Sequence, residues 1–220
     1  MENREYRKVI EYVKSQIIKG LLHLDDKLPT ERILAEELGM SRNSIREALR
    51  TMENMGMLES RQGSGNYLTG NLNKMFSESI GMMLLLKRVS YNEVNAVRRA
   101  LEADAYVLAM RNITKEMEKK LGKLYQDMEN SEGDEKVLKD KEFHYLIIRA
   151  SGNKLIISIM EALEEIYEES VGHVLNTSSK ETKDKLMLCH EKMLRCIIKK
   201  DEINGRMALN EHYDLIENQY

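Results

Sequence analysis

The sequence predicts a mostly α-helical protein in two parts, a small one with three helices and a β-hairpin, then an all-α bundle of six or seven helices. The 220 residues include one proline and 12 glycines, fewer turn residues than a β-rich fold needs. Only residues 57–68 have the character of paired strands. The length fits one large domain or two small ones.

The first part contains three helix-sized segments and the hairpin, at residues 6–19, 31–38, 42–54 and 57–68. In the first segment apolar residues recur at helical spacing until Gly20. Thr30 and Ser41 stand just before the other two segments, where a hydroxyl side chain favours the N-cap. The hairpin turns at Gln-Gly-Ser-Gly, residues 62–65.

The pattern changes after the hairpin, where the polar run at residues 69–73 marks a boundary. We expect one domain over residues 1–70 and a second, all-helical domain over residues 74–220. The second contains seven helical segments with short breaks at 89–90, 112–114, 130–134, 151–152, 176–180 and 200–201.

Composition excludes several classes of protein. With 42% hydrophobic and 32% charged residues, the chain is not disordered. The longest apolar run, residues 82–86, is too short to cross a bilayer, and no signal-peptide pattern opens the chain, so we expect a cytoplasmic protein without a membrane partner. Cys189 and Cys196 cannot form a disulfide framework. The net charge of −3 means that any nucleic-acid site is local.

Residues 31–54 have the proportions of a helix-turn-helix motif, whose second helix enters the major groove of DNA. Arg42, Asn43 and Arg46 lie opposite the apolar stripe of that helix. An arginine fork can bind guanine or phosphate, and asparagine can pair with adenine. The alternative is a surface helix whose arginines balance nearby glutamates, because residues 1–70 hold 11 Lys+Arg and 11 Asp+Glu.

The motif favours DNA binding. The run LPTERILAEELGMSRNSIREAL at residues 28–49, with glycines at 63 and 65, resembles the GntR family of bacterial transcription regulators. The chain departs from the family with Asp25-Asp26 in place of Pro-Gly, Thr30 in place of Ser and Met40 in place of Val. The resemblance implies a winged helix-turn-helix that contacts double-stranded DNA through Arg32, Arg42, Arg46, Gln62 and Gly63.

One recognition helix reads only a few base pairs, so we expect a homodimer on a pseudo-palindromic operator. The first helix after the domain boundary is apolar nearly all round, which suits a helix held by several neighbours.

Three histidines occupy positions on the inward faces of predicted helices, where packing alone gives no reason for a histidine. His190 and His212 fall on the apolar stripes of their helices, and His144 follows Asp140 by four residues, on one helix face. A single histidine of this kind is usually a satisfied core residue. Three of them with a carboxylate instead predict a divalent metal site, for Zn²⁺ first, with Ni²⁺ or Mn²⁺ as alternatives.

Arg98 lies on the predicted stripe of Val94, Val97 and Leu101. A buried arginine needs an anion, and two remain open: the carboxylate of a small effector, or Glu102 one turn away.

The second domain resembles the FCD ligand-binding domain of one GntR subfamily. The resemblance rests on Arg98-x-x-Leu101-Glu102, Asp140-Lys141-Glu142-Phe143-His144, Ser151-Gly152-Asn153, His190 and His212. It implies a metal held by Asp140, His144, His190 and His212 and ligated by small organic acids, as in the metal-binding branch.

We therefore expect a ligand-responsive transcription regulator, a repressor and not an enzyme. One alternative is a metal-dependent hydrolase with an accessory DNA-binding module. Against it, Glu142 points away from His144 on a helix, and no HExxH motif occurs. The other alternative is a regulator whose metal is purely structural.

Overall fold

The computed structural model describes residues 2–71, 73–164, 172 and 177–217. Within these ranges it has ten α-helices and one two-stranded sheet, which confirms the mostly helical fold class. Contacts between residues divide the chain into two compact units, the first ending at Glu78 and the second beginning at Ser79. No helix in the described ranges is both long and apolar enough to cross a membrane.

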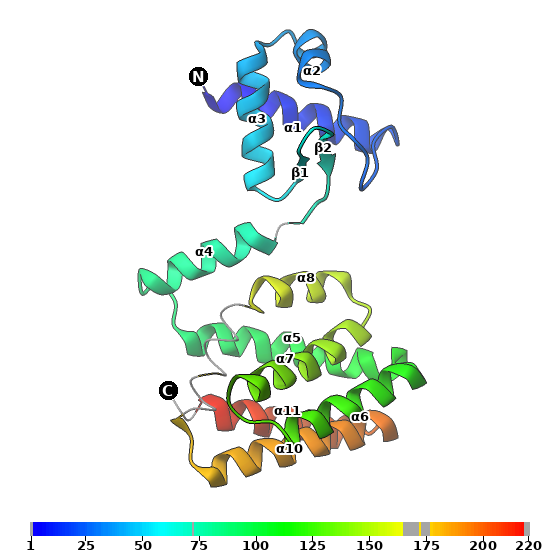
Figure 1. Cartoon of the computed structure of the whole chain (residues 1–220), viewed down its shortest axis with the longest axis vertical. Coiled ribbons are helices and arrows are strands. Elements are labelled where there is room, and N and C mark those ends of the chain that lie inside the picture. The colour runs from blue at the N-terminus through cyan, green and yellow to red at the C-terminus, as the bar shows by residue number, and fades with distance from the viewer. Residues whose placement is uncertain (1, 72, 165–171, 173–176, 218–220) are drawn as a thin grey trace. The chain divides into compact units, whose positions relative to one another are not determined.

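The N-terminal unit consists of α1 (Glu2–Ile18), α2 (Glu31–Leu38), α3 (Arg42–Asn54), β1 (Leu58–Arg61) and β2 (Gly65–Leu68) (Figure 1). The predicted caps are confirmed, because Thr30 accepts the backbone N–H of Ile33 and Ser41 accepts that of Ser44. The first helix starts earlier than predicted and ends at Ile18. The core lies where α1 and α2 pack on α3, and its fully buried side chains include Leu34 and Ile45.

The hairpin is the predicted one, with Leu58 opposite Leu68 in an antiparallel pair. The segment before α2 extends this sheet, because Lys27 bridges to Tyr67 and Leu28 N–H donates to the Asn66 carbonyl at 2.8 Å. Asp25 has a φ of 67°, a left-handed conformation that aspartate adopts more readily than most residues. The departure from the family pattern at this turn is therefore compatible with the fold.

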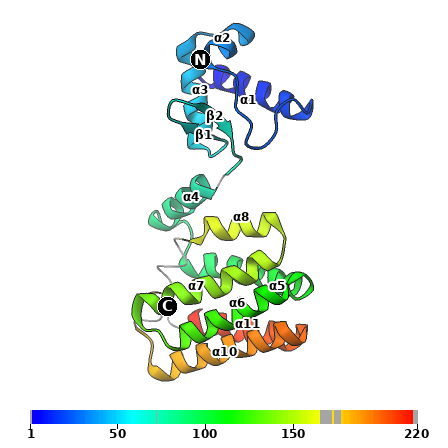
Figure 2. The same cartoon turned by 45° about the vertical axis from the view of Figure 1, so that its right-hand side comes forward.

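The remaining helices are α4 (Asn73–Leu85), α5 (Tyr91–Asn112), α6 (Lys115–Glu129), α7 (Gly133–Ala150), α8 (Lys154–Ala162), α10 (Lys180–Lys199) and α11 (Glu202–Glu217). In the C-terminal unit α5 is central and contacts α7, α8, α10 and α11. Figures 1 and 2 both show α10 and α11 side by side. The main core lies between α5, α6, α7, α10 and α11, around Tyr106, Phe143 and Ile147.

The predicted breaks separate these helices, and each of the seven predicted segments corresponds to one of them. The segment predicted between the breaks at 151–152 and 176–180 corresponds to α8, and its residues 165–171 and 173–176 lie outside the described ones. The expectation that α4 is held by several neighbours is met on one face of the helix only. Ile80 and Leu84 pack on Val94 and Leu163, whereas Met82 and Leu85 are 53% and 76% exposed.

Close packing between α5 and α11 depends on Gly205. A Cβ atom at this position would overlap Cε1 of Tyr106 and lie 2.7 Å from its hydroxyl oxygen. The hydroxyl cannot move away freely, because it donates a buried hydrogen bond of 2.6 Å to the Met193 carbonyl in α10. Gly205 is therefore the contact point at which three helices of the core meet.

We predict that Gly205→Ala lowers the free energy of unfolding by about 1–3 kcal/mol, because the added methyl overpacks the core. Urea denaturation of the full chain measures the change. Gly122→Ala in α6 is the matched control, since a Cβ there meets nothing within 4 Å. This control should be neutral or slightly stabilising. Equal effects of the two substitutions would contradict the packing argument.

Candidate metal centre and recognition helix

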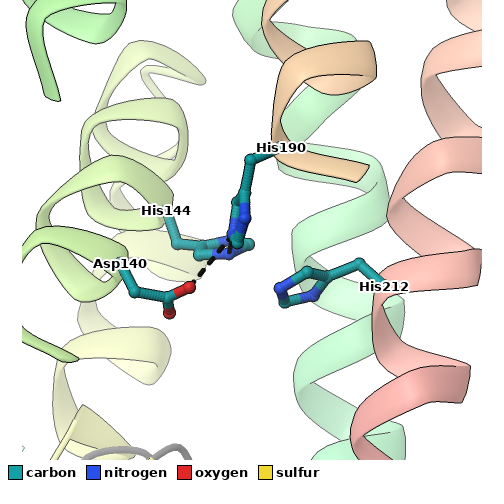
Figure 3. A group of neighbouring side chains, drawn as sticks. All are labelled: Asp140, His144, His190 and His212. Carbon is teal, nitrogen blue, oxygen red and sulfur yellow. Dashed lines mark hydrogen bonds and ion pairs between the residues drawn. The ribbon is translucent and has the colours of Figure 1, made fainter. Parts of the chain in front are cut away.

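The four predicted metal ligands meet in the core of the C-terminal unit (Figure 3). Asp140 and His144 extend from successive turns of α7, His190 from α10 and His212 from α11. Their exposed fractions are only 4%, 1%, 1% and 2%. One donor atom from each residue lies within 4.8 Å of the donor atoms of the other three. Three helices therefore bring one carboxylate and three imidazoles to a single point.

The distances within the cluster fit ligands that share one ion. His190 Nε2 lies 3.1 Å from His144 Nε2 and 3.0 Å from Asp140 Oδ1. Two ligand atoms at about 2.1 Å from one metal are about 3.0 Å apart at a right angle and about 3.4 Å apart at a tetrahedral angle. Imidazole nitrogen with carboxylate oxygen is a donor set for Zn²⁺, Ni²⁺ or Mn²⁺. The fourth residue, His212, places a donor atom within 4.8 Å of the other three.

The cluster does not satisfy its own polar atoms. Nδ1 of His190 and Nδ1 of His212 are buried without a hydrogen-bond partner in the described part of the chain. A buried polar atom without a partner costs about 1–3 kcal/mol. Imidazole rings also stack edge to face here, with centroids 4.6 Å apart for His190 and His212. Such crowding of basic rings around a carboxylate suits a cation ligated between them.

Glu102, a residue of α5, contacts the cluster through His144. This fully buried carboxylate contacts His144 Nδ1 through Oε1 and accepts a hydrogen bond of 2.7 Å from the Tyr213 hydroxyl through Oε2. The Nδ1 atom of His144 is therefore occupied, and Nε2 faces His190. A ligand histidine in a metal site is commonly held in this way by a carboxylate on its second nitrogen.

Burial and neighbouring charges shift the pKa values of Asp140, Glu102 and His212. Burial by itself raises the pKa of Asp140, but the hydrogen bond and charge of His190 outweigh burial and lower it. For Glu102 the charge and hydrogen bond of His144 likewise overcome burial, so the pKa is lowered. Burial and the charges of His190 and His144 hold the pKa of His212 well below its usual value. Both carboxylates are therefore anionic, and His212 is neutral and able to ligate.

Arg98 is completely buried in α5, as predicted, and of the predicted stripe Val94 is buried and Leu101 half-buried, but Val97 is not. Val97 is 53% exposed, and the buried face of the helix runs through Val94, Arg98 and Glu102. Nη1 of Arg98 donates to the Leu163 carbonyl at 3.3 Å. Burial raises the pKa of Glu102, and the positive charge of Arg98 helps to lower it, by less than His144 and Tyr213 do.

In the N-terminal unit, α3 presents Arg42, Asn43 and Arg46 to solvent, while Ile45 and Leu49 are buried. Arg46 is held in place by α2. Its Nε and Nη2 donate to the two carboxylate oxygens of Glu31 at 3.0 and 2.8 Å. This bidentate pair uses two of five N–H donors of the guanidinium, so three remain for another partner.

The other predicted contacts lie on the same unit. Arg32 is exposed and pairs with Glu36 at 3.0 Å. Gln62 and Gly63 are exposed at the tip of the hairpin, where Gly63 has a φ of 72°. Beside them, the Arg61 guanidinium lies 4.2 Å from the centroid of the Tyr67 ring.

Sequence reasoning missed two partners. It considered Glu102 only as a partner of Arg98, whereas Glu102 contacts His144 across 42 positions of sequence. It did not consider Glu31 as a partner of Arg46, 15 positions away. Both contacts join different helices, so periodicity within one helix contains no signal for them.

Comparisons with known proteins agree with this architecture. Residues 5–68 match the family described as bacterial regulatory proteins, gntR family, and residues 93–215 match the FCD domain. The transcriptional regulator LutR of Bacillus subtilis is 26% identical over 91% of this chain and 94% of its own. The regulator YcbG of the same organism is 25% identical over 97% and 88%. A GntR structure from Streptococcus agalactiae covers both chains fully with a TM-score of 0.70 at 22% identity, which shows the same fold.

The FCD match alone spans more than half of the chain, and the gntR match contains α2, α3 and the hairpin. The full-length relatives are transcription regulators rather than enzymes. The chain therefore belongs to the GntR family of bacterial transcription regulators that carry an FCD effector-binding domain.

Proposed function

We propose that this regulator is a repressor whose second domain binds one divalent metal ion and a small organic acid. Residues 1–70 read the operator, and residues 74–220 sense the effector. The observation that carries the proposal is the buried group of Asp140, His144, His190 and His212, whose donor atoms lie within 4.8 Å of one another. A purely structural ion is the competing interpretation, and the tests below separate the two.

Four protein donors leave room for an effector on the ion. Zn²⁺ can expand from four ligands to five, and Ni²⁺ and Mn²⁺ accept six. A carboxylate is a good additional ligand, and it also matches the fork of an arginine. Arg98 is buried on the same side of α5 as Glu102, which touches His144. We therefore assign Arg98 as a second anchor for the effector.

The DNA-reading surface is assigned to exposed residues of α2, α3 and the hairpin: Arg32, Arg42, Asn43, Arg46, Gln62 and Gly63. Arg46 is the best defined of these, because Glu31 fixes its guanidinium while leaving three N–H donors. Such a fixed fork loses little conformational entropy when it binds guanine in the major groove.

A homodimer supplies the second recognition helix. One helix reads too few base pairs for selective binding, and two-fold symmetric dimers match pseudo-palindromic operators. The exposed apolar side chains of α4, among them Met82 and Leu85, support association of two copies. Sedimentation at micromolar concentration should give a dimer, and a monomer with full specific binding would contradict this assignment.

We predict that His190→Ala weakens Zn²⁺ binding by on the order of 100-fold, since one of four ligands is lost. Zinc competition with a chromophoric chelator measures the affinity. A thermal-shift screen of small carboxylates on the zinc-loaded protein measures the effector response. Both should fall together, while DNA binding without effector is retained.

His23→Ala is the matched control, because His23 is exposed in the N-terminal unit. It should leave zinc affinity unchanged. Stoichiometric zinc and a normal effector response in His190→Ala would contradict the four-residue site. A structural ion would instead be supported by two results together. His190→Ala would lose zinc and stability, and the wild-type protein would show no response to any carboxylate in the screen.

We predict that Arg46→Ala weakens specific operator binding by about 1–3 kcal/mol, because a bidentate base contact is lost. The operator is first selected from random duplexes, and affinities are compared at one salt concentration. Arg46→Lys keeps the charge but not the fork, so it should lose most of the same specificity. Lys14→Ala removes one charge from α1 and should bind normally; wild-type affinity in Arg46→Ala would refute the assignment.

We predict that Glu31→Gln also weakens operator binding, because it removes the carboxylate that holds Arg46. Its effect on the free energy of unfolding should stay below about 1 kcal/mol, since the pair is on the surface with 34% and 48% of its side chains exposed. Urea denaturation and operator titration of the same variant separate the two effects. An unchanged operator affinity would show that Arg46 needs no positioning.

The repressor role is tested with the selected operator placed in a promoter before a reporter gene. Reporter expression should be low when the regulator is present and should rise when an effector found in the thermal-shift screen is added. Activation of the reporter by the effector-free protein would overturn this part of the proposal.

A further inference from the structure

We infer that Glu102 is a positioning residue of the metal centre: it fixes the ring of His144 and so raises the affinity of the site for its ion. The inference rests on the proposed metal function and adds a residue outside the four ligands. Glu102 lies on α5, which supplies none of those four ligands, and its carboxylate is completely buried.

Both oxygens of Glu102 are used. Oε1 contacts Nδ1 of His144, and Oε2 accepts the Tyr213 hydroxyl at 2.7 Å. Two partners on opposite sides fix the plane of the carboxylate, and the carboxylate in turn fixes the imidazole ring. Because Nδ1 is occupied, the ring is held in the tautomer whose Nε2 can ligate.

The orientation produced by this contact is the one that the cluster needs. His144 Nε2 points to the other ligands and lies 3.1 Å from His190 Nε2. A ring free to rotate would lose this arrangement in part of the population, and the ion would have to select the correct rotamer. Preorganised ligands avoid that loss of affinity.

Glu102 also connects the helices that carry the ligands. Its partners His144 and Tyr213 belong to α7 and α11, and His212 is the neighbour of Tyr213 in α11. One carboxylate of α5 therefore helps to set the separation of the helices that bear His144 and His212. The negative charge of Glu102, close to the ligand imidazole, further favours a bound cation.

The alternative is that Glu102 only satisfies a buried histidine and stabilises the fold. In that case its removal lowers the stability of the metal-free and metal-bound protein by the same amount, and zinc affinity does not change. A positioning role predicts a loss of zinc affinity in a protein that retains all four ligands. Zinc affinity and metal-free stability, measured on the same variants, therefore separate the two roles.

The test is Glu102→Leu in the full-length protein, because leucine removes both acceptor oxygens and so releases the His144 ring, while all four ligands remain. Zn²⁺ and Ni²⁺ affinities are measured by competition with a chromophoric chelator, and urea denaturation follows the metal-free protein. We expect both metal affinities to fall by about 10–100-fold. Asp104→Asn, an exposed carboxylate on the same helix, is the control and should bind metal normally.

Wild-type zinc affinity in Glu102→Leu would overturn the inference. If this variant does not fold, Tyr213→Phe takes its place, because it frees Oε2 and leaves the four ligands and the charge of Glu102 intact. We expect severalfold weaker zinc binding by Tyr213→Phe, and unchanged affinity would overturn the inference. Absence of zinc binding by the wild type would refute the proposed metal function itself, which is a distinct result.

Discussion

The packing of the C-terminal unit is constrained by the polar side chains in its interior, because each of them needs a partner there. Six acidic or basic side chains of the described residues are almost fully buried there: Arg98, Glu102, Asp140, His144, His190 and His212. Burial without partners is costly for each of them, so their positions are coupled. Glu102 pairs with His144, His144 meets His190, and His190 meets Asp140. The packing of α5, α7, α10 and α11 therefore has to bring these groups together as one cluster.

The two units solve the placement of charge differently. In the N-terminal unit the charged pairs are on the surface, where the ion pair of Glu31 and Arg46 contributes little to stability and is available to position a side chain. In the C-terminal unit the charged cluster lies against the apolar core, where the Phe143 ring contacts the rings of His144 and His190. The low dielectric there strengthens every interaction with an ion.

Local pattern was enough to predict most of the fold and the four candidate ligands. The bounds of α2 and α3 follow from their caps, and Asp140 with His144 follows from helical spacing. The prediction that Val97 lies on the buried face of α5 was wrong, because apolar character alone does not decide which face of a helix is buried. Arg98 and Glu102 define that face instead. The contact between Glu102 and His144 was beyond reach, since it depends on how α5 packs against α7.

The proposed metal centre requires Asp140, His144, His190 and His212 to ligate one ion. X-ray absorption at the zinc edge of the full-length protein, loaded with one equivalent of Zn²⁺, tests this claim most directly. One carboxylate and three imidazoles should give a first shell of nitrogen and oxygen at about 2.0–2.2 Å with the outer-shell signature of imidazole. A sulfur shell at about 2.3 Å, which would implicate Cys189 or Cys196, or a spectrum without imidazole, would contradict it.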